Sequence, residues 1–296
     1  GNITYDGQSS GLEIGGIIGR ENDTNGFLKY AYNSGSIINK STCSGNSNIG
    51  GVVGYGYIPL YKVYNAGEIN NIQPGVSCLY LGGVYGHNES NEKSEYVFNS
   101  GNITNISSGS STYVGGISGY GKNMSNVYQA GDLNNDVSGS TCWVGGLYGY
   151  MSSDSSVNLE NMYLLGNVKS NDNCQNIYRG NIIGYIGASE VNKTNVNYSK
   201  NSVIKFLDST SLAYPKYVLN GEVIDDVSNI GFAYLDTKEF YDILNEEKVW
   251  YRINGYNPRL NGANANVKPG NVFEVTNTIK KYKIITNVEE RNGVKG

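Results

Sequence analysis

A two-part phrase is repeated six times along this chain of 296 residues. Its first half reads Gly-Gly-Ile-Ile-Gly at residues 15–19, and its second half reads Tyr-Asn-Ser-Gly-Ser-Ile at residues 32–37. Successive first halves begin 35, 32, 33, 30 and 35 residues apart, at Gly15, Gly50, Gly82, Gly115, Gly145 and Gly180. A fixed period with one supersecondary unit per copy is typical of a stacked solenoid. The repeat therefore constrains the fold more strongly than any single residue does. For function, it indicates only a broad class.

Apolar residues recur at fixed positions in each copy, in short runs rich in Val, Ile and Tyr that predict strands. The positions just before and just after the glycine pair have opposite parity. Side chains of a flat strand alternate between its two faces, so the chain must bend at the glycines for both positions to point inward. These positions are Ile14, Ile49, Leu81, Val114 and Val144 before the pair, Ile17, Val52, Val84, Ile117, Leu147 and Ile182 after it, and Ile37, Ile69, Ile103, Leu133, Val168 and Val203 in the second half.

These features predict an all-β fold, a parallel β-helix (β-solenoid) of about six coils with a small C-terminal cap of helix and strand. Identical positions then stack from coil to coil, which aromatic rings and side-chain amides stabilise. A propeller would need a longer blade, of about 40 or more residues. We expect an aromatic ladder at Tyr32, Tyr64, Phe98, Tyr128, Tyr163 and Tyr198, followed by an amide ladder at Asn33, Asn65, Asn99 and Gln129.

The sequence predicts three regions: repeats over residues 1–204, a cap over residues 205–262, and a linker with the truncated start of another module over residues 263–296. A solenoid needs a cap because its last coil exposes strand edges and apolar side chains. Residues 235–244 predict a helix with Asp236 as its N-cap, and residues 249–260 predict a closing strand and turn. Because Gly1 matches mid-repeat Gly101, we expect a fragment of a longer protein, with its export signal and anchor elsewhere.

Composition and charge narrow the classes of function. A net charge of −4, with few clustered basic residues, argues against nucleic acid as a partner. No apolar run reaches the roughly 18–20 residues of a membrane span, so we expect no membrane insertion by this fragment. The 39% hydrophobic content is sufficient for a folded core despite the richness in Gly, Ser and Asn.

Four cysteines fall in equivalent parts of four copies: Cys43, Cys78, Cys142 and Cys174. Cys43 and Cys78 belong to neighbouring copies, as do Cys142 and Cys174. Coils stacked about 4.8 Å apart bring such positions close to the separation that a disulfide needs. The offsets from the glycine pair differ by three residues in both pairs, however, so buried thiols and disulfides both stay open. Zinc is not expected, because no Cys-x-x-Cys occurs and the chain has one histidine.

Catalytic and metal-binding residues are not predicted, and no cofactor is expected. Carboxylates are sparse within the repeats, and no His-Glu-x-x-His or strand–helix Gly-x-Ser-x-Gly occurs. His87 falls in a column otherwise filled by tyrosines, which favours a stacked surface ring over a general base. The acidic loop at residues 21–26 lacks the full spacing of a calcium loop.

One feature predicts a binding surface. Two residues before the glycine pair, at a position expected to face outward, lie Tyr80, Tyr113, Trp143 and Tyr178. Successive coils align them into an aromatic strip, which offers rigid apolar area with a polar edge to a sugar or a protein. The alternative is that these rings only stack on one another and shield the sheet.

The phrase Gly-Gly-hydrophobic-x-Gly, paired with Tyr-Asn-x-Gly-x-Ile, resembles the GLUG-motif repeats of secreted bacterial surface proteins. Trp250 and the closing residues 254–260 are similar to the end of such arrays, with one inserted Asn before Pro258. The resemblance covers residues 1–262 and is weakest in the sixth copy, which departs at Asn181. It implies a β-helix in an exported protein, since these repeats occur in adhesin-like proteins and in the non-catalytic part of IgA-specific metalloendopeptidases. It transfers no ligand and no catalytic residue.

The sequence thus favours a non-catalytic adhesion or stalk module of a larger bacterial extracellular protein, secreted and held at the cell surface. Its expected partner is a host or cell-surface glycan or protein, unless the module is only a spacer. Two alternatives stay open. One is a carbohydrate-active β-helix enzyme, which would gather three acidic residues and a basic one in a groove. The other is an accessory domain that orients a distant peptidase domain.

Overall fold

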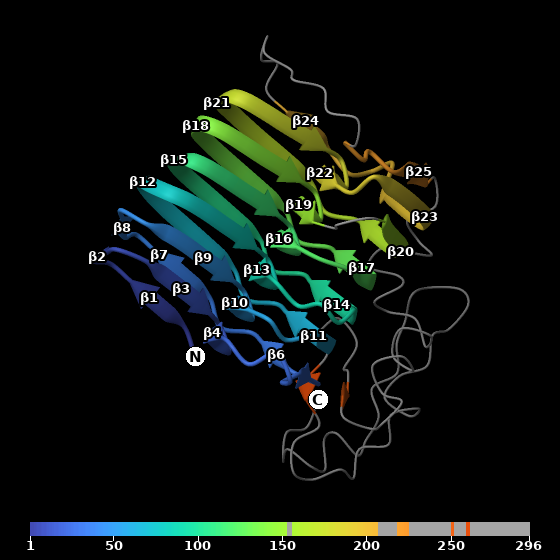
Figure 1. The fold of residues 1–296 in the computed structure, drawn as a ribbon, viewed down its shortest axis with the longest axis horizontal. Coiled ribbons are helices and arrows are strands. Elements are labelled where there is room, and N and C mark those ends of the chain that lie inside the picture. Colours follow the sequence, from blue (N-terminus) through green and yellow to red (C-terminus); the bar gives the residue numbers. More distant parts are fainter. Residues whose placement is uncertain (153–155, 207–217, 225–249, 252–258, 261–296) are drawn as a thin grey trace, which may run out of the picture. The chain divides into compact units, whose positions relative to one another are not determined.

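The computed structural model describes residues 1–152, 156–206, 218–224, 250–251 and 259–260. The chain divides into two compact units, Gly1–Asp225 and Asp226–Gly296. The described residues form strands and no helix, and in the first unit the paired strands are parallel (Figure 1). This confirms the predicted all-β class and the parallel β-solenoid of about six coils.

Three sheets run along the first unit, and every coil contributes to all three. The first sheet contains β1 (Ile3–Tyr5), β3 (Leu12–Gly15), β7 (Ile37–Asn39), β9 (Asn46–Gly50), β12 (Ile69–Gly82), β15 (Ile103–Gly115), β18 (Leu133–Gly145), β21 (Val168–Gly180) and β24 (Ile204–Phe206). The second contains β4 (Ile18–Glu21), β10 (Val53–Gly56), β13 (Tyr85–Asn88), β16 (Ser118–Gly121), β19 (Tyr148–Ser152) and β22 (Ile183–Gly187).

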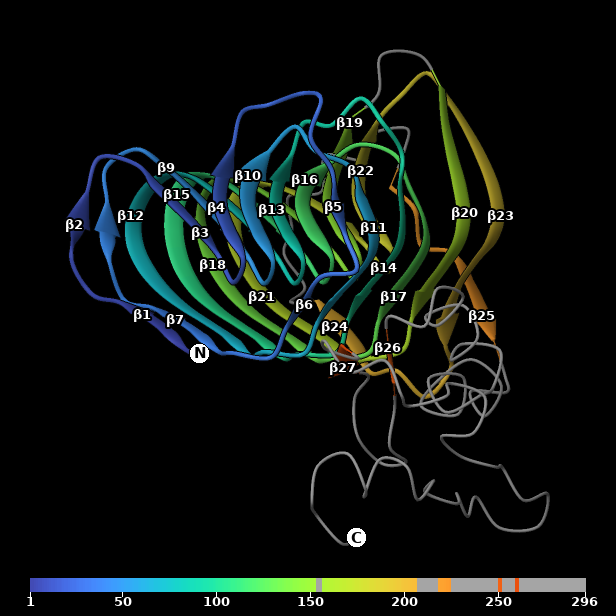
Figure 2. The same cartoon turned by 90° about the horizontal axis from the view of Figure 1, so that it is seen from below.

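The third sheet contains β5 (Leu28–Lys29), β6 (Tyr32–Asn33), β11 (Leu60–Asn65), β14 (Ser94–Asn99), β17 (Met124–Gln129), β20 (Ser156–Leu164), β23 (Glu190–Ser199) and β25 (Glu222–Ile224). A short pair is formed by β2 (Gln8–Ser9) and β8 (Thr42–Cys43). Coils one to six are numbered here by their second-sheet strands, from β4 to β22, and Figure 2 shows them turned by 90°.

The chain bends at the glycine pair, as predicted. In the third coil, β12 ends at Gly82 and β13 begins at Tyr85. A Cβ atom on Gly83 would lie 2.1 Å from the Gly116 carbonyl oxygen and 2.3 Å from Asn99 Nδ2. Only a residue without a Cβ fits there. This contact explains why the two halves of the phrase recur together: the second glycine of the pair makes room for the amide of the second half.

The predicted amide ladder is confirmed. Asn33 Nδ2 donates to Asn65 Oδ1 at 2.9 Å, and Asn65 Nδ2 donates to Asn99 Oδ1 at 2.8 Å. Asn99 Nδ2 then donates to Gln129 Oε1 at 2.9 Å. All four side chains are buried, so each amide bond satisfies polar atoms that water does not reach. Leu164 takes the next position and ends the ladder.

A second buried amide ladder, which the sequence reading missed, lies in the first sheet. Asn39 donates to Asn71 at 2.7 Å, Asn71 donates to Asn105 at 2.8 Å, and Asn105 donates to Asn135 at 2.7 Å. The signal was present, because each of these asparagines comes two residues after the conserved-position Ile or Leu of its copy. The prediction for this stretch rested only on the spacing of its apolar residues.

The core follows the predicted columns except at Ile17 in the first coil and Val203 in the sixth copy. Ile49, Leu81 and Val84 are fully buried, as are their equivalents in later coils. Ile17 was predicted to point inward but is 44% exposed. Its coil has a neighbour on one side only, because β4 is the edge strand of the second sheet.

The sixth copy departs from two predicted positions. Asn197 lies opposite Tyr163, and Tyr198 lies opposite Leu164, so Tyr198 does not extend the aromatic ladder in register. Ile204 pairs with Val168, whereas the predicted Val203 is 42% exposed. The turn between β23 and β24 is longer than the turn between β20 and β21. Sequence spacing alone assigned Tyr198 and Val203 to columns that Asn197 and Ile204 occupy.

Beyond the sixth coil, β24 and β25 each add a parallel strand to their sheets. In the second unit, β26 (Trp250–Tyr251) pairs antiparallel with β27 (Arg259–Leu260), where a closing strand and turn were predicted. The helix predicted at residues 235–244 lies outside the described residues. The region boundaries at residues 204 and 262 stay predictions.

Candidate aromatic binding face

The predicted strip comes together at the ends of four neighbouring strands, β12, β15, β18 and β21. Tyr80 is in register with Tyr113, Tyr113 with Trp143, and Trp143 with Tyr178. Their ring centroids lie 4.7, 4.2 and 5.5 Å apart in that order, and the ring planes differ by at most 7°. All four side chains are half-buried. The parallel register therefore aligns the strip as one stacked column.

A second column lies beside it, on the second sheet just after the glycine bend. It consists of Tyr55, His87, Tyr120, Tyr150 and Tyr185, from β10, β13, β16, β19 and β22. The neighbouring centroids of this column are 4.6–5.1 Å apart. Sequence reasoning recognised this column around His87 but did not place it against the strip.

The two columns meet edge to face. Tyr113 lies 6.0 Å from Tyr120 and from Tyr150, with ring planes 86° and 81° apart. Trp143 and Tyr150 meet at 81°, and Tyr178 and Tyr185 at 72°. This is a herringbone of nine rings, here called the aromatic face, in which neighbours cover most of each ring face. Edge-to-face contacts of this kind contribute about 0.5–1.5 kcal/mol each beyond the area they bury.

Burial shifts the pKa of several phenols of this face. It raises the pKa of Tyr80 and of Tyr113 well above the ordinary range, and neighbouring polar groups add to the shift. Burial likewise raises the pKa of Tyr150. A neutral phenol both donates and accepts a hydrogen bond. The face therefore offers ring edges and hydroxyls to a partner over the whole physiological pH range.

His87, one of the nine rings, contacts a carboxylate beside this face. Its Nε2 atom lies 2.8 Å from Glu89 Oε1, and its ring stacks on Tyr80 at a centroid distance of 4.3 Å. Lys122 Nζ lies 3.5 Å from the other oxygen of Glu89. The hydrogen bond with His87 lowers the pKa of Glu89, although partial burial opposes the shift. Glu89 thus links His87 and Lys122 at the border of the face.

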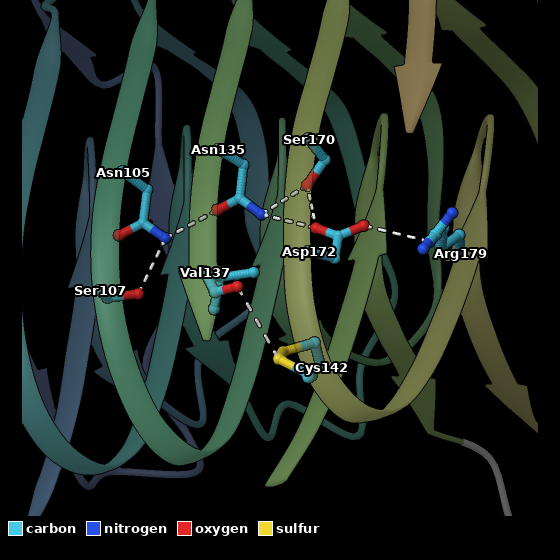
Figure 3. Close-up of a disulfide and its surroundings, with 9 residues drawn as sticks. Asn105, Ser107, Asn135, Val137, Cys142, Ser170, Asp172 and Arg179 are labelled. Atoms are coloured by element: carbon cyan, nitrogen blue, oxygen red, sulfur yellow. Dashed lines mark hydrogen bonds and ion pairs between the residues drawn. A yellow bond between two sulfur atoms is a disulfide. The ribbon is translucent and has the colours of Figure 1, made fainter. Parts of the chain in front are cut away.

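A buried carboxylate and an arginine lie at the end of the first-sheet ladder (Figure 3). Asn135 Nδ2 donates to Ser170 Oγ at 2.7 Å, and Ser170 donates to Asp172 Oδ1. The other oxygen of Asp172 lies 3.1 Å from Arg179 Nε. Burial raises the pKa of Asp172, against the opposing effects of Ser170 and Arg179. Asp172 is fully buried and Arg179 is 11% exposed, so the carboxylate that ends the ladder does not meet solvent.

A disulfide lies beside this pair and joins coils five and six. It links Cys142 to Cys174, whose Cα atoms are 6.1 Å apart (Figure 3). Cys43 and Cys78 are free thiols, the first buried and the second half-buried. The repeat spacing left both disulfides and free thiols open for each pair. The structure has a disulfide in one pair and free thiols in the other.

The described residues hold no group of three or more His, Cys, Asp or Glu side chains placed to bind a metal ion. In the acidic loop, Asn25 N donates to Asp23 Oδ1 at 2.9 Å, and Asp23 N donates to Glu21. These carboxylates thus bind their own backbone. No helix among the described residues is long and apolar enough to cross a membrane.

No protein-family model matches the chain, and no curated protein shows significant similarity to it. A solved structure that matches is a candidate immunoglobulin A1 protease from Bacteroides ovatus, at 16% sequence identity and a TM-score of 0.43. The match covers 79% of this chain and 74% of that protein. Similarity at this level carries no conclusion about activity.

Proposed function

We propose that this chain is a non-catalytic module of a larger protein displayed outside a bacterial cell, and that it binds a host or cell-surface glycan or protein through the aromatic face. The observation that carries the proposal is the nine-ring herringbone, half-buried and with neutral phenols, along one side of a rigid solenoid. A stalk role for the same module, or the orientation of a distant peptidase domain, is the outcome if no ligand binds.

Two further features support the proposal. The disulfide between Cys142 and Cys174 favours an oxidising compartment, since disulfides persist outside the cytosol. The resemblance to GLUG-motif repeats implies the same location. For the enzyme alternative, three acidic residues and a basic one in one groove were expected. The described groove on the first sheet has Asp136 as its one acid, beside Lys169 and Lys205.

The stacked rings define the kind of contact. Their faces are covered by neighbouring rings, so a flat sugar ring cannot lie on an aromatic platform within the column. The ring edges and hydroxyls instead form a ridge along the coils. Such a ridge suits a partner that spans several coils and hydrogen-bonds to phenols.

The test is a screen of the purified chain on arrays of glycans and extracellular-matrix proteins. The variant Tyr113→Ala/Trp143→Ala removes the centre of the aromatic face. A matched control, Ile72→Ser/Val203→Ser, alters two exposed apolar residues outside the aromatic face. We expect binding that disappears in the first variant and persists in the control, with both variants folded by circular dichroism. No binding to any array member would reject a ligand-binding role and leave the spacer.

A further inference from the structure

A groove on the outer side of the first sheet lies far from the aromatic face. It runs between two columns of outward-pointing side chains on β15, β18, β21 and β24, and its volume is about 540 Å³. Asn134, Lys169 and Lys205 stand in one column. Ile106, Asp136 and Asn171 stand in the other. Lys169 and Tyr178 are nine residues apart on β21, about 30 Å of extended chain.

Two lysines lie opposite each other at one end of this groove, and neither forms an ion pair with a described residue. Lys169 and Lys205 are register partners on neighbouring strands, and both are exposed. Neither makes a hydrogen bond or an ion pair within the described part of the chain. Like charges directly opposite on neighbouring strands destabilise a sheet. A bound anion would remove that cost.

Two other lysines of this solenoid form ion pairs with glutamates, which the groove lysines do not form with described residues. Lys93 lies 3.2 Å from a Glu160 oxygen, and Lys193 lies 3.0 Å from a Glu222 oxygen. In the groove, Asp136 accepts a hydrogen bond from Asn171 at 3.1 Å. The described residues therefore leave the positive charge at Lys169 and Lys205 without an ion-pair partner.

The remaining groove residues favour a sugar chain over a peptide. Asn134, Asp136 and Asn171 are exposed and match the donors and acceptors of sugar hydroxyls, while Ile106 gives one apolar contact. The strands β15, β18 and β21 are paired on both edges, so a peptide cannot add to them as a further strand, whereas β24 has a described partner on its β21 side only. Four strands about 4.8 Å apart span roughly 15 Å, enough for a short oligosaccharide.

We propose that this groove binds an anionic oligosaccharide, with its carboxylate or sulfate groups between Lys169 and Lys205. The ammonium groups supply charge-assisted hydrogen bonds, and the asparagines orient the rings. This site is separate from the aromatic face and does not depend on the proposed function of that face.

The test is calorimetric titration with four probes: tetragalacturonate for carboxylates, a heparin tetrasaccharide for sulfates, neutral maltotetraose, and tetraglutamate as an anionic peptide. The variant Lys169→Gln/Lys205→Gln is compared with Lys93→Gln/Lys193→Gln, which removes two exposed lysine charges of the third-sheet side. We expect binding of at least one anionic sugar, weakened about tenfold or more in the groove variant, which corresponds to about 1.4 kcal/mol or more. The control and Tyr113→Ala/Trp143→Ala should bind as the wild type does.

The comparison between the two anionic sugars tells carboxylate from sulfate recognition. Absence of binding by both anionic sugars would overturn the proposal, and so would an equal loss in the control. Equal binding of maltotetraose would reject the role of charge. Equal binding of tetraglutamate would reject the sugar and indicate an acidic peptide instead.

Discussion

From the first coil to the fourth, one amide hydrogen bond is repeated with almost no change, at 2.9, 2.8 and 2.9 Å. At the fifth coil Leu164 interrupts that ladder. Coils five and six are joined by a covalent contact, the Cys142–Cys174 disulfide, and the buried Asp172–Arg179 pair lies within β21 of coil six. The repeat phrase also decays there, at Asn181 and in the shifted positions of Tyr198 and Ile204.

This difference teaches how a solenoid tolerates loss of its repeat. Identical coils reuse the same short-range contact, so each copy stabilises its neighbours by the same means. Where the sequence loses those residues, the neighbouring coils need contacts of another kind. The disulfide is such a contact, because it closes a loop between residues 32 apart in the sequence. The Asp172–Arg179 pair acts within β21, where removal of one partner leaves a buried charge unpaired. The predictions below test this contrast.

The largest effect is expected at the buried ion pair. Arg179→Met leaves the fully buried Asp172 without its counter-charge, and we expect the free energy of unfolding to fall by about 3–5 kcal/mol at neutral pH. Urea denaturation measures this. The loss should shrink as pH falls, because the pKa of Asp172 in the folded protein is already raised by burial and would rise further.

A double variant controls for packing at this site. Asp172→Asn/Arg179→Met removes both charges and should recover most of the lost stability, since a neutral pair carries no uncompensated charge. If the double variant is as unstable as Arg179→Met, lost packing and not charge explains the effect.

The next effect is expected at the disulfide. Reduction of the wild-type protein should lower the free energy of unfolding by about 2–4 kcal/mol, because the link closes a long loop between coils five and six. Denaturation curves with and without reductant measure the change. Cys142→Ala/Cys174→Ala is the control, and a response of that variant to reductant would contradict the assignment of the effect to this bond.

Much of the frame could be predicted from the sequence, for a physical reason. Strand pairing in a parallel solenoid follows the repeat, so equal positions in successive copies become neighbours. That is why Asn33, Asn65 and Asn99 were recognised as a ladder before their hydrogen bonds were seen. The same rule gave the stacking order of Tyr80, Tyr113 and Trp143.

What could not be predicted depends on contacts across the bend or on breaks in the period. The edge-to-face contact of Tyr113 with Tyr120 joins two sheets. The repeat spacing does not determine the angle between those sheets. Register places Cys142 opposite Ile177 and Cys174 opposite Gly139, so the disulfide is diagonal. The offsets from the glycine pair differ by three residues in both cysteine pairs, so the spacing did not distinguish Cys142 and Cys174 from Cys43 and Cys78. The groove lysines escaped notice because Lys205 lies beyond the sixth copy.

Within the amide ladder, position should decide the cost of a substitution. Asn99→Leu removes a residue that bonds to Asn65, Gln129 and the backbone of Gly101, and we expect a loss of about 2 kcal/mol. Gln129→Leu at the end of the ladder should cost about 1 kcal/mol, because Asn99 keeps its bond to Gly101. Thermal unfolding of both variants gives the order. A larger loss for Gln129→Leu than for Asn99→Leu would contradict the view that the ladder is the main stabilising contact between these coils.

The smallest effect concerns Glu89, in the third coil. Its pKa is lowered by the hydrogen bond with His87, so its contribution to stability is present above the ordinary Glu pKa and is lost as pH falls through the lowered value. The stability difference between wild type and Glu89→Gln should therefore be largest near neutral pH and shrink in acid. Chemical denaturation at several pH values measures it, and a difference independent of pH would refute the assignment.

Hydrogen–deuterium exchange, resolved by coil, tests the contrast between the two regions most directly. The oxidised and reduced proteins are compared in native buffer, with peptides from β12 and β15 set against peptides from β21 and β22. If unique contacts hold the last coils and ladders hold the earlier ones, reduction will speed exchange in β21 and β22 and leave β12 and β15 protected. Equal acceleration in all coils, or none in β21 and β22, would contradict it.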